Sequence, residues 1–102
     1  MKVSNAQLDK NQIINFLREH KPYLEKEFGV TRIALFGSYS REEQTTTSDI
    51  DLAIEMAIPS FKNHCHLKEF LEKHLQRHVD LCYFKGMRSF IRHAIDKELV
   101  YA

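Results

Sequence analysis

Cysteine, glycine, proline and tryptophan are all scarce in this chain of 102 residues, which contains two Cys, three Gly, two Pro and no Trp. Cys65 and Cys82 form neither a framework of disulfide pairs nor a metal-binding spacing, so we expect both thiols to be reduced. A chain of this length, 43% hydrophobic and 28% charged, is typical of one globular domain, with no room for a second core. We therefore expect a single domain over 1–102.

Long apolar runs and an excess of charge of one sign are also missing. No stretch approaches the roughly 20 apolar residues that cross a membrane, and residues 1–10 lack the apolar core of a signal peptide. We therefore expect a cytoplasmic protein without membrane contact. Fifteen Lys and Arg against fourteen Asp and Glu leave a formal charge of +1, which argues against direct nucleic-acid binding.

Hydrophobic patterning predicts helices and strands in alternation. Residues 13–28 have helical spacing, Pro22 is expected to start a second helical segment within them, and Gly29 is a C-cap candidate. Strands are predicted over 30–36, 50–55 and 79–84; further helices are predicted over 39–43, after Ser60 with Phe61 on its apolar stripe, and over 87–99. This order predicts an α/β or α+β fold, with helices packed on a small mixed sheet of three strands.

Asp49 and Asp51 flank Ile50 at the start of the second predicted strand. Side chains alternate along a strand, so the two carboxylates should share one face. Two bare carboxylates about 5 Å apart repel by roughly 3 kcal/mol at an effective dielectric constant of about 20. The pair therefore needs a shared proton or a cation, and we expect Mg²⁺. Asp80 on the third predicted strand joins them if that strand neighbours the second.

Gly37-Ser38 directly follows the first predicted strand, and ten residues separate this pair from Asp49. Such a turn can present N–H groups and a hydroxyl to a phosphate, and glycine allows the phosphate to approach the backbone. Arg41 follows one short turn later, where it could bind a phosphate or form an ion pair with Glu42, Glu43 or Asp51. Both alternatives for Arg41 stay open. Tyr39 could stack on a base or pack beside the turn.

The histidines do not predict a metal site. In His64-Cys65-His66, neighbouring side chains splay about 100° apart on a helix, so they cannot share one ion. We expect His20, His74, His78 and His93 to be surface or boundary residues.

The chain resembles the nucleotidyltransferase superfamily that includes DNA polymerase beta and kanamycin nucleotidyltransferase. The resemblance is carried by residues 36–41 (FGSYSR), 48–52 (SDIDL) and 79–81 (VDL). The resemblance is closest to the minimal nucleotidyltransferases, antitoxins found beside HEPN-domain toxins, and runs from about Ile13 to the end. Members often carry glycine after the arginine, where this chain has Glu42.

The resemblance implies residue roles. Asp49, Asp51 and Asp80 would be catalytic and would hold two Mg²⁺ ions, or Mn²⁺, with Asp80 helping to activate the acceptor hydroxyl. Gly37, Ser38 and Arg41 would bind the ATP phosphates.

It also implies a function, namely transfer of AMP from ATP to a tyrosine of a HEPN toxin that binds this chain. Two alternatives stay open. One is a binding-only antitoxin with a vestigial nucleotide site, against which the intact set of three acids argues. The other is a small-molecule nucleotidyltransferase, against which the missing acceptor domain argues.

Overall fold

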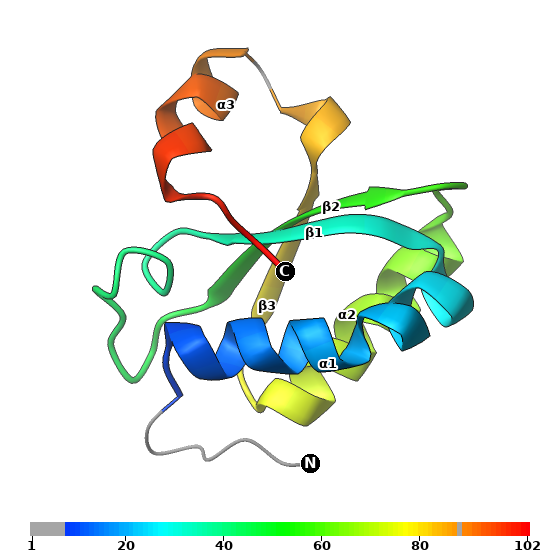
Figure 1. The fold of residues 1–102 in the computed structure, drawn as a ribbon, viewed down its shortest axis with the longest axis horizontal. Helices are drawn as coiled ribbons and strands as arrows, with labels where there is room; N and C mark the ends of the chain where they lie inside the picture. Colours follow the sequence, from blue (N-terminus) through cyan, green and yellow to red (C-terminus); the bar gives the residue numbers. More distant parts are fainter. Residues whose placement is uncertain (1–7, 88) are drawn as a thin grey trace.

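The computed structural model describes residues 8–87 and 89–102, with side chains described for 8–87 and 92–102. Two long helices, α1 and α2, cover one side of a sheet, and α3 lies on the other side (Figure 1). The elements in chain order are α1 (Lys10–Phe28), β1 (Val30–Phe36), β2 (Ile50–Met56), α2 (Phe61–Leu75), β3 (Val79–Tyr83), the 3₁₀ turn η1 (Phe84–Gly86), α3 (Ser89–Ile95), the 3₁₀ turn η2 (Asp96–Glu98) and β4 (Val100–Tyr101).

The sheet is mixed, as the sequence predicts, with strand order β3-β2-β1-β4. β1 is antiparallel to both β2 and β4, whereas β2 and β3 are parallel. The expectation of three strands was one too few, because Val100 and Tyr101 pair with β1. The helix predicted over 87–99 is accordingly shorter, ends at Ile95 and continues as η2.

Helix α1 is continuous, so the second helical segment expected from Pro22 was wrong. Its start is closed by a capping box between Asp9 and Gln12, and Gly29 ends it in the left-handed conformation at φ 73°. Pro22 lies on the exposed side of the helix. There water can hydrate the carbonyl that the missing proline N–H leaves unpaired, so the helix does not have to end.

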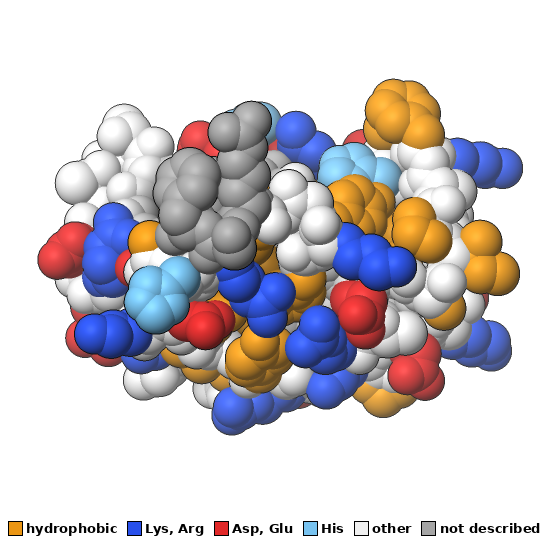
Figure 2. Space-filling model, turned by 90° about the horizontal axis from the view of Figure 1, so that it is seen from above, with side chains coloured by type: hydrophobic (Ala, Val, Ile, Leu, Met, Phe, Trp, Pro, Cys, Tyr) orange, Lys and Arg blue, Asp and Glu red, His pale blue; other side chains and the backbone are white. Residues whose placement is uncertain are grey.

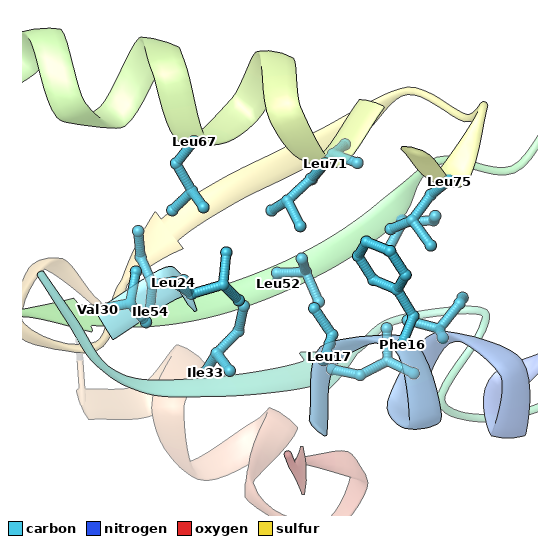
Figure 3. Close-up of a cluster of buried hydrophobic side chains, with 14 of the residues drawn as sticks. Phe16, Leu17, Leu24, Val30, Ile33, Leu52, Ile54, Leu67, Leu71 and Leu75 are labelled. Atoms are coloured by element: carbon cyan, nitrogen blue, oxygen red, sulfur yellow. The ribbon is translucent and has the colours of Figure 1, made fainter. Parts of the chain in front are cut away.

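The main core fills the space between the sheet and the pair α1 and α2 (Figure 3). Alternate residues of β2 and every fourth residue of α2 point into it, as strand and helix periods require. The fully buried side chains of these two elements are Ile50, Leu52, Ile54, Leu67, Leu71 and Leu75. Phe61, expected on the apolar stripe of α2, is instead 83% exposed, because it opens the helix directly after the Ser60 N-cap.

The opposite face of the sheet is thinly covered. Ala34 and Ala53 form a small second cluster there with Phe84 of η1, and the guanidinium groups of Arg32 and Arg92 lie over the Phe84 ring. Figure 2 shows the α3 side of the molecule, where Lys and Arg side chains are mixed with Asp and Glu. Among the described residues, none of the helices is both long enough and apolar enough to span a membrane.

The short helix predicted over 39–43 is wrong, because this segment is a series of turns. Its backbone hydrogen bonds join Arg41 N to Gly37 O, Glu42 N to Tyr39 O, and Glu43 N to Ser38 O. The spacing of the bonded residues therefore changes at each step, and no regular helix can form. Glu42 occupies the left-handed region at φ 59°, a conformation that favours glycine.

Replacing Glu42 with glycine should stabilise the fold. The left-handed conformation costs a residue with a Cβ about 1–2 kcal/mol, part of which is offset by the greater freedom of glycine in the unfolded chain. We expect Glu42→Gly to raise the free energy of unfolding by about 0.5–1 kcal/mol, measured by urea denaturation. Thr46→Gly, in the same loop, should give no gain. An unchanged or lower free energy for Glu42→Gly would contradict the strain assigned to this position.

Candidate active site

The three acidic residues singled out in the sequence lie at one end of the sheet, although Asp51 is not in the group whose ligand atoms lie within 4.8 Å of one another. Asp51 and Asp80 are partners in the parallel pairing of β2 with β3, so their side chains share a face. Asp49 directly precedes β2, and each of Asp49, His78 and Asp80 offers a ligand atom within 4.8 Å of the others. Ile50 and Leu52, on the opposite face of the strand, are fully buried. The alternation expected from the sequence is therefore correct.

Asp51 lies in an unfavourable electrostatic environment. Partial burial raises the pKa of its carboxyl above the ordinary value, and the charges of Asp80 and Asp49 raise it further, while Arg41 acts in the opposite direction. Like charges gathered in a partly desolvated site need a cation or a proton. A set of carboxylate oxygens is what Mg²⁺ and other hard divalent cations prefer. The residues present therefore fit a divalent metal.

Gly37 joins the turn to this acidic group. Its φ of 80° is in the left-handed region, and a Cβ placed on Gly37 would overlap the carboxylate of Asp51. The close approach arises because Phe36, the last residue of β1, pairs with Asp51. Glycine is thus required both for the backbone conformation and for the space that Asp51 occupies.

The anion-binding groups of the turn are engaged by Glu98, which the sequence analysis missed. Its Oε1 accepts a hydrogen bond from the Gly37 N–H at 2.9 Å, and Arg41 contacts both carboxylate oxygens at 3.1 and 3.2 Å. The Ser40 hydroxyl donates to the Glu98 backbone carbonyl. Local patterning could not reveal this contact, since 61 positions separate Glu98 from Gly37.

The structure also bears on the alternatives left open for Arg41 and Tyr39. Arg41 forms ion pairs, with Glu43 at 2.9 Å and with Glu98 at 3.1 Å. Of the ion-pair partners named from the sequence, Glu43 is the one found, and phosphate binding by Arg41 stays a prediction. Tyr39 is 1% exposed and packs in the core, not in a position to stack on a base. Ser38 remains half-buried in the turn.

His78 is the second residue that sequence reasoning missed. It is exposed, as expected, but it belongs to the acidic group. Its Nδ1 lies 2.7 Å from Oε2 of Glu72 on α2, and its Nε2 lies 4.0 Å from Oδ1 of Asp80. The spacing of His78 and Asp80, two residues apart at the start of a strand, is the signal that could have found it. His64, in contrast, contacts the Tyr83 hydroxyl at 3.1 Å.

The sequence matches a known protein family and several named relatives. The model of the nucleotidyltransferase domain family matches residues 17–102. A protein of Methanocaldococcus jannaschii, provisionally named a protein adenylyltransferase, is 41% identical over 95 residues, which cover 89% of this chain and 95% of that protein. The protein adenylyltransferase MntA of Thermococcus cleftensis is 37% identical over 97 residues, covering 94% of this chain and 98% of the relative.

Solved structures show the same fold. A structure provisionally described as a minimal nucleotidyltransferase superposes with a TM-score of 0.76 at 27% identity, covering 92% of this chain and 96% of that one. A toxin–antitoxin crystal structure with AMP-PNP superposes with a TM-score of 0.65 at 28% identity, covering 92% of this chain and 72% of that one. A chain from a complex of tri-AMPylated Shewanella oneidensis HEPN toxin with MNT antitoxin superposes with a TM-score of 0.56 at 26% identity, covering 90% of this chain and 66% of that one. The predicted fold class is therefore confirmed.

The raised pKa of Asp51 has a consequence for stability without metal. The folded state keeps the Asp51 proton to higher pH than the unfolded chain, so ionisation of Asp51 lowers the free energy of unfolding as pH rises from its ordinary value of 3.8. In EDTA, Asp51→Asn should match the parent protein below that pH. It should become the more stable of the two as pH rises towards neutrality, measured by urea denaturation.

The exposed Glu69→Gln variant on α2 is the matched control and should show no such rise. A stability difference between Asp51→Asn and the parent that does not grow with pH would contradict the electrostatic strain at Asp51.

Proposed function

Because this chain belongs to the nucleotidyltransferase domain family, among relatives named protein adenylyltransferases, we propose that it transfers AMP from ATP to a tyrosine hydroxyl of a cognate HEPN toxin. It would thereby act as the antitoxin. The observation that carries the proposal is the register that pairs Asp51 with Asp80 beside the Gly37 turn. The complex of a tri-AMPylated HEPN toxin with an MNT antitoxin supports the choice of acceptor.

Asp49, Asp51 and Asp80 would hold the divalent ions, two Mg²⁺ in our proposal, with Mn²⁺ as a substitute. When bound, these ions would supply positive charge that stabilises the entering and leaving oxygens of the displacement. The carboxylates contribute the negative charge that draws the ions to this end of the sheet, and the pairing of β2 with β3 fixes their spacing.

Asp80 would act on the acceptor, because its side chain is 56% exposed and accessible to a partner. Its carboxylate would accept the proton of the tyrosine hydroxyl as the oxygen attacks the α-phosphorus of ATP. One oxygen–phosphorus bond then forms to the tyrosine. The bond from the α-phosphorus to the bridging oxygen breaks, and pyrophosphate leaves with that oxygen.

Gly37, Ser38 and Arg41 would bind the phosphates of ATP. The Gly37 N–H and the Arg41 guanidinium already bind a carboxylate, that of Glu98, which supports their assignment to an anion. In our proposal the triphosphate replaces the Glu98 carboxylate on these two groups. Arg41 would then bind an anion of higher charge at the same position.

The decisive test is AMP transfer to the protein partner. The chain is co-expressed with a candidate HEPN partner, and the intact mass of that partner is measured. We expect an increase of one or more AMP units, reduced by roughly a thousandfold or more in rate with Asp49→Ala or Asp51→Ala, because metal-derived charge stabilisation supplies much of the rate. Thr46→Ala, in the loop before these acids, is the matched control.

Two results would contradict the proposed enzymatic function or its metal site. A partner that stays unmodified but is still neutralised would establish the binding-only antitoxin. Near-normal transfer by a soluble Asp49→Ala protein would overturn the metal-site assignment.

Nucleotide binding tests the phosphate turn separately. Glu98→Gln should tighten Mg-ATP binding by about threefold to tenfold, because a competing charge is removed from Arg41. Gly37→Ala should abolish binding, since the Cβ overlaps Asp51, and Ser38→Ala should be milder because the N–H groups remain. Calorimetric titration of Mg-ATP measures all three variants. Weaker binding by a folded Glu98→Gln would mean that Glu98 builds the turn and does not compete with phosphate.

A further inference from the structure

We propose that His78 is a nitrogen ligand of the metal site, and that the site therefore binds first-row transition ions such as Zn²⁺ more tightly than carboxylates alone would. The inference rests on the proposed function in one respect, namely that Asp49 and Asp80 bind a divalent ion. It adds a ligand and a metal preference that the three acids do not supply.

The position of His78 follows from the strand. It directly precedes Val79, the first residue of β3, and lies two residues before Asp80, so both side chains project from the same face. The Ile50 N–H donates to the His78 carbonyl at 2.9 Å, which continues the β2–β3 ladder to this point and fixes the backbone. His78, Asp49 and Asp80 offer ligand atoms within 4.8 Å of one another, although Asp49 comes from a different segment.

The orientation of the imidazole ring is fixed from the other side. Glu72 Oε2 lies 2.7 Å from His78 Nδ1 and also accepts the Val79 N–H at 2.9 Å. A carboxylate can only accept, so Nδ1 carries the hydrogen of this contact. In the neutral ring the lone pair is then on Nε2, the nitrogen that faces Asp80 at 4.0 Å. That separation is too long for a hydrogen bond and leaves Nε2 available to an ion.

This arrangement has the form of a metal-binding histidine, whose second nitrogen is usually held by a carboxylate that sets the tautomer and raises the basicity of the ligand. Imidazole suits Zn²⁺, Cu²⁺ and related ions, whereas Mg²⁺ prefers oxygen ligands and water. A site of two carboxylates and one imidazole should therefore favour a transition ion. The alternative is that His78 only forms an ion pair with Glu72, in which case its loss would not change metal preference.

Metal titration of the free protein separates these alternatives without nucleotide or partner. Zn²⁺ and Mg²⁺ affinities are measured by calorimetry for the parent, for His78→Ala and for His93→Ala, an exposed histidine of α3. We expect His78→Ala to weaken Zn²⁺ binding at least tenfold and Mg²⁺ binding by less than about threefold. His93→Ala should behave as the parent. Equal losses for the two ions, or a Zn²⁺ affinity within about threefold of the parent, would overturn the inference.

A second measurement does not depend on the folding of any variant. In the ¹⁵N-labelled parent, adding Zn²⁺ should shift the Nε2 resonance of His78 and leave that of His93 unchanged. An unshifted His78 in zinc-saturated protein would also overturn the inference.

The two proposals can fail independently. Zinc binding that depends on His78, without AMP transfer in Mg²⁺, would overturn only the proposed AMP-transfer function. AMP transfer in Mg²⁺, with a zinc affinity that does not depend on His78, would overturn only the assignment of His78 as a metal ligand.

Discussion

The register of β2 against β3 is the constraint on which the candidate site depends. Leu52 and its alternate neighbours on β2 are fully buried against α1 and α2, so β2 cannot rotate without exposing them. A slip of one residue would bring Asp51 into the apolar core and remove Leu52 from it. Asp80 faces Asp51 because the parallel pairing continues that register. The hydrophobic core on one face of the sheet thereby fixes carboxylate geometry on the other.

The same placement leaves the site electrostatically strained, and the strain is confined to one end of the sheet. Asp51 is close to Asp49, Asp80 and Glu98, and Arg41 is the cation that acts on it from the turn. Similar carboxylates elsewhere on the surface would separate into solvent. Here the backbone holds them together, as expected of a group that functions with a bound cation.

The sequence was most informative where the chemistry of the side chains agrees with the local period of the secondary structure. Asp49 and Asp51 share a face because strands alternate, and a glycine-ended strand before them indicated a turn nearby. It was least informative about contacts across long chain separations. The two residues of β4 are too short for a periodic pattern, and Glu98 reaches Gly37 only because β4 returns the chain to β1. Pro22 led to the wrong prediction of a second helical segment. The energetic cost of a proline inside a helix depends on whether that face of the helix is exposed, which the spacing of residues alone does not tell.

Glu98 further suggests how metal and nucleotide binding are linked. Its carboxylate adds negative charge next to Asp51 and, at the same time, occupies Arg41, the local source of positive charge. A triphosphate that takes over Arg41 releases Glu98 into a site already crowded with carboxylates. A divalent cation bound to those carboxylates offsets this added repulsion, so each ligand makes the other easier to bind. On the proposed function, cooperative binding of metal and nucleotide would therefore follow from the exchange at Arg41 and would need no change in the fold.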